Sequence, residues 1–189
     1  MKTLKFVLAA VIMISSTAMF AKEVVVNTKK STVEWYGSKI GGDHDGFIQL
    51  KSGSFKLKND KIVDGNFVID MTTITNTDIE DEEYNAKLVG HLKSDDFFGV
   101  EKFPTANFVV TSSTEFKDGK AKITGDLTIK GKTESMSFDV VRNGNDYSTK
   151  IDVDRSKFDV RYGSDSFFDN LGDKVIADIF TLDIKLVVK

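Results

Sequence analysis

The chain has 189 residues, of which 40% are hydrophobic and 29% charged, with 15 Phe, one Pro and no Cys. This composition is typical of one compact domain and excludes collagen-like, disordered and disulfide-stapled classes. The net charge of −3 argues against a protein that binds phosphate backbones through a basic surface, so we expect no nucleic-acid partner.

The first residues have the pattern of a secretory signal. Lys2 and Lys5 precede an apolar run over residues 6–14, and small residues follow at 15–18 and at Ala21. A basic segment, an apolar segment and then small residues is the order found in cleaved signal peptides. An uncleaved membrane anchor is the alternative, but the run falls short of the ~20 apolar residues that span a bilayer.

Two cleavage positions fit this signal, one after Ala18 and one after Ala21. We predict a signal peptide over residues 1–21 and a mature domain over residues 22–189. The mature protein is then expected in the periplasm or outside the cell. The lack of Cys is compatible with such an oxidising compartment.

From Glu23 onward, apolar and polar residues alternate with a period of two. This is the pattern of β-strands with one buried face. Polar or Gly-containing turns are predicted at 59–61, 117–119, 130–132 and 142–145. About eight strands are spaced as in hairpins, and eight strands can close into a barrel that holds side chains or one slender ligand.

Residues 82–93 break this alternation and predict a helix lying on the sheet. Glu83 is placed four residues before Lys87, a spacing that allows an ion pair on a helix. The apolar positions share one face and are Tyr84, Leu88 and Leu92. The predicted fold is therefore mainly β, an extended antiparallel eight-stranded β-barrel with one helix on the outside.

The sequence offers few groups for catalysis. It has no thiol, no Gly-x-Ser-x-Gly motif, no phosphate-binding glycine loop and two His. We therefore predict a protein that is not an enzyme and has no catalytic residues.

The two histidines, His44 and His91, have three open interpretations. They could belong to a metal site, but such sites usually need three protein ligands. They could be structural residues of a turn and a helix. They could also lie at the polar end of a ligand, since pockets place few polar groups among many apolar ones. We predict no metal site and keep both as candidate ligand contacts.

The large number of aromatic residues is the strongest functional signal. Several aromatic rings fall on strand faces that alternation directs inward: Trp35, Phe55, Phe67, Phe108, Phe138 and Phe158. A barrel lined by such rings either fills itself to ordinary packing density or leaves a dry slot for an apolar chain. Periodicity does not distinguish these two outcomes.

Two segments carry a family resemblance. HLKSDDFFGVEKFPTANF at 91–108 and GDLTIKGKT at 125–133 resemble signatures of the YceI-like family of lipid- and polyisoprenoid-binding proteins. The resemblance implies a lipocalin-like barrel whose apolar tunnel holds the long tail of an amphiphile. One departure is that Leu88 and Val89 occupy places where many members have Arg and Asp.

The predicted function is an exported, non-enzymatic protein that holds the apolar tail of an isoprenoid-type amphiphile, polyprenyl or quinone-like, for transport or storage. The alternatives are a fatty acyl or fatty amide binder, a filled-barrel stress or interaction module, and a quinone-linked redox helper. No cofactor is expected other than a bound isoprenoid or similar lipid. Expected partners are that lipid, a membrane in transient contact, and a second copy of the chain in a homodimer.

The residues predicted to contact the ligand are Trp35, Phe55, Phe67, Ile69, Met71, Phe108, Leu127, Ile129 and Phe138 along the tunnel, with His44 and His91 at its polar end.

Overall fold

The structure is a computed structural model that describes residues 20–189. Apart from Phe20 and Ala21, the predicted signal peptide lies outside the described residues and stays a prediction. Within residues 20–189, no helix combines the length and the apolar content needed to cross a bilayer.

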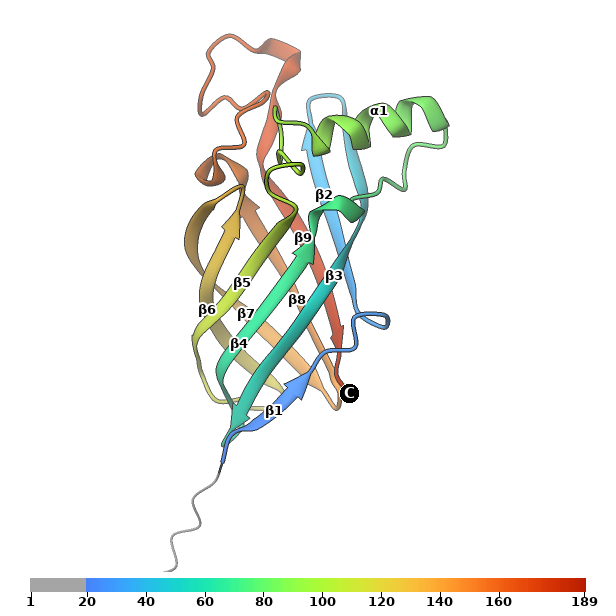
Figure 1. Ribbon diagram of the computed structural model, residues 1–189. Helices are drawn as coiled ribbons and strands as arrows, with labels where there is room; N and C mark the ends of the chain where they lie inside the picture. Colours follow the sequence, from blue (N-terminus) through green and yellow to red (C-terminus); the bar gives the residue numbers. More distant parts are fainter. Residues whose placement is uncertain (1–19) are drawn as a thin grey trace, which may run out of the picture.

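The described chain forms one antiparallel sheet that closes on itself as a tall barrel (Figure 1). Each strand from β2 to β9 pairs with the next, and β9 pairs with β2 to complete the circle. The strands are β1 (Lys22–Val25), β2 (Thr32–Lys39), β3 (Gly42–Lys58), β4 (Lys61–Asp70), β5 (Thr105–Ser113), β6 (Lys120–Ile129), β7 (Lys132–Asn143), β8 (Asp146–Asp154) and β9 (Ile176–Val187).

β1 and β2 occupy the same strand position in the barrel, so β1 does not add a ninth strand position. The long strand β3 pairs with β2 through residues 42–48 and with β1 through residues 54–57. On the other side, Val26 bridges to Val188 just beyond β9, the strand that also pairs with β2. The barrel therefore has eight strand positions, and the predicted closed eight-stranded fold is confirmed.

Alternation in β6 shows why these segments form a barrel wall. The inward positions are buried and alternate with residues that face outward; they are Ala121, Ile123, Gly125, Leu127 and Ile129. The turn that follows has positive φ at both Lys130 and Gly131, the geometry of the tight hairpin turn that matches strand twist.

The helix α1 (Glu82–Lys93) has the predicted bounds. Asp81 accepts hydrogen bonds from the N–H groups of Glu83 and Tyr84, and the predicted Glu83–Lys87 ion pair forms at 2.7 Å.

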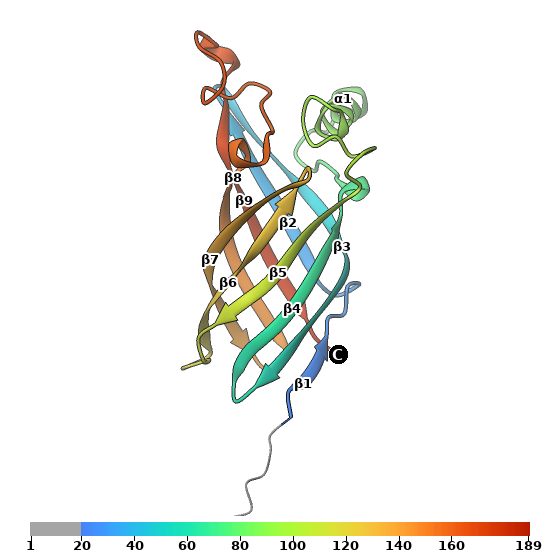
Figure 2. The same cartoon turned by 60° about the vertical axis from the view of Figure 1, so that its left-hand side comes forward.

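α1 lies outside the barrel, as predicted, but at its open end rather than flat on the sheet. The helix lies beside the open end of the barrel, opposite the segment 155–175 (Figure 2). Leu88 and Leu92 turn toward the barrel interior, whereas Tyr84 is 64% exposed. The four-residue spacing predicts a helix face, but it does not say which part of the barrel that face meets.

β7 and β8 form the shortest junction of the barrel wall. In the described structure they pair from Val141 with Ser148 to Asn143 with Asp146, all next to their connecting turn. Further up, the Thr149 hydroxyl donates to the carbonyl of Asp139 at 2.7 Å and takes the place of a backbone pair.

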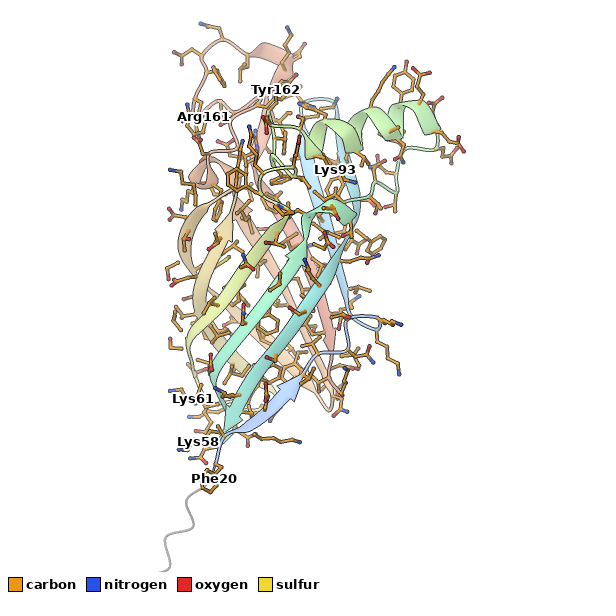
Figure 3. All side chains as sticks on the ribbon, viewed as in Figure 1. Phe20, Lys58, Lys61, Lys93, Arg161 and Tyr162 are labelled. Carbon is orange, nitrogen blue, oxygen red and sulfur yellow. The ribbon has the colours of Figure 1, made fainter. Side chains whose placement is uncertain are left out.

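The interior holds two apolar clusters stacked along the barrel. One lies toward the open end and includes Met71 and Leu92; the other lies toward the opposite end and includes Phe55 and Tyr147. Figure 3 marks the two ends, with Tyr162 at the open end and Lys58 at the other, which we call the closed end. Phe108 and Phe138 pack against both clusters and connect them.

Gly125 makes room for one of these connecting rings. A Cβ atom at this position would overlap the Phe108 ring and lie 2.5 Å from the backbone oxygen of Val109. Position 125, which faces the Phe108 ring, therefore requires glycine.

We predict that Gly125→Ala destabilises the protein by about 1–3 kcal/mol, because neither the ring nor the β5 backbone can move without cost. The matched control is Gly90→Ala in α1, where a Cβ would meet nothing within 4 Å. That change should stabilise the protein by about 0.5–1 kcal/mol, since Ala is the better helix former. Urea unfolding measures both, and equal stability of the two variants would contradict the packing argument.

Candidate functional site

The barrel contains a large apolar cavity at its open end, which we call the upper cavity. Its volume is about 460 Å³, and its wall comes from several strands, from α1 and from Phe97 and Phe98. Seven of the residues predicted to contact the ligand line it: Trp35, Ile69, Met71, Leu127, Ile129, His44 and His91.

A second and narrower space, the lower cavity, lies beneath it. It has a volume of about 120 Å³, and its lining is mostly apolar. The remaining predicted wall residues line it: Phe55, Phe67, Phe108 and Phe138. The structure thus brings all eleven predicted residues to the two cavities, and their contact with a ligand stays a prediction.

The two cavities share a ring of four aliphatic residues, which we call the waist: Val33, Ile69, Leu127 and Leu182. The β9 segment from Ile176 in the upper cavity to Leu186 in the lower cavity extends about 33 Å along the strand. With the usual strand tilt, this corresponds to about 25 Å along the barrel axis. Of the two outcomes that periodicity left open, the interior is hollow rather than filled by its own rings.

The lower cavity ends in an aromatic floor. The Tyr147 ring meets Phe55 edge-on at 5.1 Å and Phe116 at 6.0 Å between ring centroids. The Arg142 guanidinium covers the outer side of Phe116 at 4.5 Å and pairs with Asp60 at 3.0 Å. These contacts place aromatic rings across this end of the barrel.

His44 lies at the rim of the upper cavity and is held by a carboxylate. Its Nδ1 is 2.8 Å from Asp78, which also accepts from the N–H of Asp45 and from the Asn76 side chain. Burial raises the pKa of the Asp78 carboxyl, but these hydrogen bonds outweigh it, so the pKa lies below its ordinary value. Asp78 therefore remains charged at neutral pH and fixes the imidazole in place.

His91 closes the opposite side of the mouth through aromatic contacts. Its ring meets Tyr162 edge-on at 4.3 Å between centroids and Phe97 at 5.7 Å. Because Tyr162 belongs to the segment 155–175, this contact links α1 to that segment across the opening.

Arg155 holds the segment 155–175 over the barrel. It is 2% exposed and donates to the backbone oxygens of Val160, Tyr162, Ile176 and Ala177 at 2.8–3.0 Å. Burial lowers the pKa of its guanidinium, while nearby carboxylates, Asp178 first among them, oppose that shift.

The counter-charge of Arg155 is Asp178. Its carboxylate is 3.3 Å from the guanidinium and accepts from the Ser166 hydroxyl at 2.5 Å. Since both charges lie inside the protein, each depends on the other to offset its loss of water.

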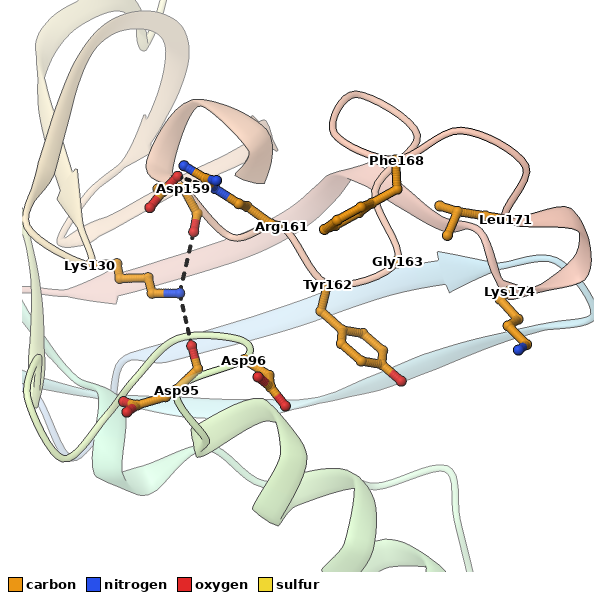
Figure 4. A pocket seen from close by; sticks show the side chains of 10 residues that line it. All are labelled: Asp95, Asp96, Lys130, Asp159, Arg161, Tyr162, Gly163, Phe168, Leu171 and Lys174. Atoms are coloured by element: carbon orange, nitrogen blue, oxygen red, sulfur yellow. Dashed lines mark hydrogen bonds and ion pairs between the residues drawn. The ribbon is translucent and has the colours of Figure 1, made fainter.

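An open cleft of about 560 Å³ lies beside the mouth (Figure 4). Two contacts hold cationic side chains in this cleft: Lys130 donates to the backbone oxygens of Asp95 and Asp159, and Arg161 pairs with the Asp159 carboxylate. Tyr162 and Lys174 line both this cleft and the upper cavity. A group that emerges from the tunnel would therefore enter the cleft.

Several residues of the mouth were not predicted from the sequence. Arg155, Tyr162 and Phe98 all line the cleft or the upper cavity, and none was predicted as a contact. They lie in connecting segments, where period-two alternation carries no information about direction. Arg155 continues the two-residue spacing of the buried strand residues Ile151 and Val153, and this is the one signal that could have directed attention to it.

Among residues 20–189, no group of three or more His, Cys, Asp or Glu side chains is placed to hold a metal ion.

The fold and its cavities define a class of protein, the closed β-barrel with apolar internal cavities. Comparison with protein families matches residues 25–188 to the YceI-like domain. The chain belongs to the YceI-like family, and the resemblance found in the sequence is confirmed.

Two relatives show how far the sequence similarity extends. The UPF0312 protein SAR2769 of Staphylococcus aureus is 32% identical over 130 residues, or 69% of this chain and 61% of the relative. A UPF0312 protein of Shewanella denitrificans is 32% identical over 124 residues, or 64% of this chain and 62% of the relative. The matched region thus spans about three fifths of these relatives.

Two solved structures share the fold. BcnA from Burkholderia cenocepacia has a TM-score of 0.67 and 25% identity, covering 87% of this chain and 99% of BcnA. A polyisoprenoid binding domain from Saccharophagus degradans has a TM-score of 0.59 and 13% identity, covering 88% of this chain and 97% of that domain.

We predict that Arg155→Met destabilises the protein by about 3–5 kcal/mol, because it leaves Asp178 buried without its counter-charge and frees four backbone oxygens. The matched control is Arg161→Met, which removes an exposed ion pair with Asp159 and should change stability by about 0.5 kcal/mol or less. Urea unfolding gives both values. A similar small loss for the two variants would show that Arg155 does not hold the segment.

Proposed function

We propose that this protein is a non-enzymatic carrier that holds the apolar tail of an isoprenoid-type amphiphile inside its barrel. The observation that carries the proposal is the pair of stacked apolar cavities joined at the waist. Leaving such a tail in water costs about 0.8 kcal/mol per methylene, and a closed apolar tunnel removes that cost. The name of the Saccharophagus degradans neighbour, a polyisoprenoid binding domain, supports the same ligand class.

The length of the tunnel favours a long tail. The hydrocarbon core of a bilayer is about 30 Å thick, so an acyl chain of one leaflet spans roughly 15 Å. The two cavities together extend about 25 Å along the barrel axis. A polyprenyl tail uses this depth better than an ordinary fatty acyl chain does.

The mouth favours a polar headgroup with little charge, such as a quinone-like ring. The cleft beside the mouth has as many carboxylates as cationic side chains, and Arg161 is already paired with Asp159. Tyr162 and His91 offer ring faces and hydrogen-bonding groups at the exit of the tunnel. A diphosphate carries several negative charges, and the carboxylates of Asp95, Asp96 and Asp159 in this cleft would repel it.

Exposed apolar side chains at the open end support loading from a membrane. Ile40, Phe167 and Phe168 are 55%, 39% and 49% exposed, and Ile40 is tied to the segment 155–175 through a backbone bond to Val175. Side chains of this kind bind the interface of a bilayer, where a tail could pass directly into the mouth. In our proposal the protein does this after export, in the periplasm or outside the cell, for transport or storage.

Binding can be followed with the chain's own fluorescence, because Trp35 is its single tryptophan and lines the upper cavity. Titration with geranylgeraniol should change Trp35 emission in a saturable way. Ala106→Phe, which adds a ring inside the upper cavity, should weaken this affinity by about tenfold or more through lost tail burial.

The matched control is Val109→Phe on the same strand, where the side chain faces outward and is exposed. Its affinity should equal that of the unchanged protein. Native mass spectrometry of protein purified without detergent provides a second test. An empty protein that also ignores prenyl and acyl alcohols would contradict the proposal.

A further inference from the structure

We infer that the lower cavity sets the maximum tail length that this barrel accepts, with Val140 and Phe108 as specificity-determining residues. The inference rests on the proposed function, since it concerns the same tunnel. It goes further by assigning different roles to the two cavities. The upper cavity admits any apolar tail, and the lower cavity limits how many further carbons of the tail can be buried.

The first observation is the unequal size of the two cavities. Below the waist, the space falls from about 460 to about 120 Å³. A short tail can therefore be buried entirely above the waist, while a longer one has to enter a space with little volume to spare.

The second observation is that the walls of the lower cavity are fixed. The Phe67 ring packs where Gly53 and Gly65 leave room, because a Cβ at either position would lie within 3.4 Å of that ring. The Phe108 ring occupies the space left by Gly125 and meets Phe138 at 5.3 Å. Close-packed rings of this kind cannot move aside cheaply, so the cavity cannot expand around extra carbons.

The third observation is the closed floor. Tyr147 contacts both Phe55 and Phe116 at the end of the cavity, and the Arg142 guanidinium lies over the Phe116 ring. A tail that reaches these rings meets the end of the cavity, so any further carbons are expected to remain near the mouth in contact with water.

These observations predict how affinity depends on tail length. Each added methylene should tighten binding about fourfold as long as it is buried, and should add almost nothing once the tail has reached the floor. A plot of log affinity against chain length should therefore rise steadily and then become flat. The position of the break measures the depth of the tunnel.

The experiment uses straight-chain primary alcohols from octanol to tetracosanol, with Trp35 emission as the readout. Val140→Phe places a ring in the lower cavity and should move the break to shorter chains, without changing the slope before it. Phe108→Leu removes a ring from the same cavity and should move the break to longer chains. Circular dichroism during heating checks that each variant is folded.

The matched control is Val141→Phe, one residue further along β7, where the side chain faces outward and is exposed. In this variant, affinity should stop rising at the same chain length as in the unchanged protein. If Val140→Phe does not fold, Ile184→Phe fills the same cavity from β9 and replaces it.

The outcomes separate this inference from the proposed function. Saturable binding with no break, or a break that stays fixed in Val140→Phe and Phe108→Leu, would overturn the assignment of the lower cavity while leaving a tail-binding protein. No binding of any alcohol by the unchanged protein would overturn the proposed function itself.

Discussion

Closure of the sheet is the constraint on which the rest of the structure depends. Because β9 pairs with β2, backbone hydrogen bonds join neighbouring strands around the circle, and the inward side chains can line a space without having to fill it. An open sheet would need a second layer against its apolar face. Here the opposite wall of the same sheet provides that layer. The diameter of an eight-stranded barrel thus leaves room for the cavities. The rings of Phe67, Phe108 and Phe138 determine how much of the interior volume stays empty.

Most of the fold could be predicted from the sequence, because period-two alternation is a direct record of which side chains face the interior. Ile123, Leu127 and Ile129 are inside for the same reason that they alternate with polar residues. The bounds of α1 were also predictable, since its N-terminal acids, its four-residue spacing and the Glu83–Lys87 pair are all local features. The predicted wall residues come to the two cavities because strand position alone directs them there.

What the sequence did not reveal depends on contacts between distant segments. The position of α1 beside the mouth follows from Leu88 and Leu92 meeting an interior that no local pattern describes. The role of Arg155 requires backbone oxygens from residues up to Ala177, which only the folded chain brings together. The hollow interior also depends on contacts between distant segments. Alternation predicts which rings face inward, but it does not predict whether those rings contact one another. Phe55 and Tyr147 do meet and form the floor, while the rings above them leave space.

The meeting of β1 with the end of β9 has a practical consequence. Val26 bridges to Val188, and the N–H of Lys189 donates to the backbone oxygen of Val25 at 3.0 Å, so both described ends of the chain lie at the pole opposite the opening (Figures 1 and 3). A fusion partner or an immobilising linker joined at Phe20 or Lys189 would therefore leave the opening unobstructed. On a sensor chip or a bead coated in this way, every copy would present its entrance to the surrounding liquid.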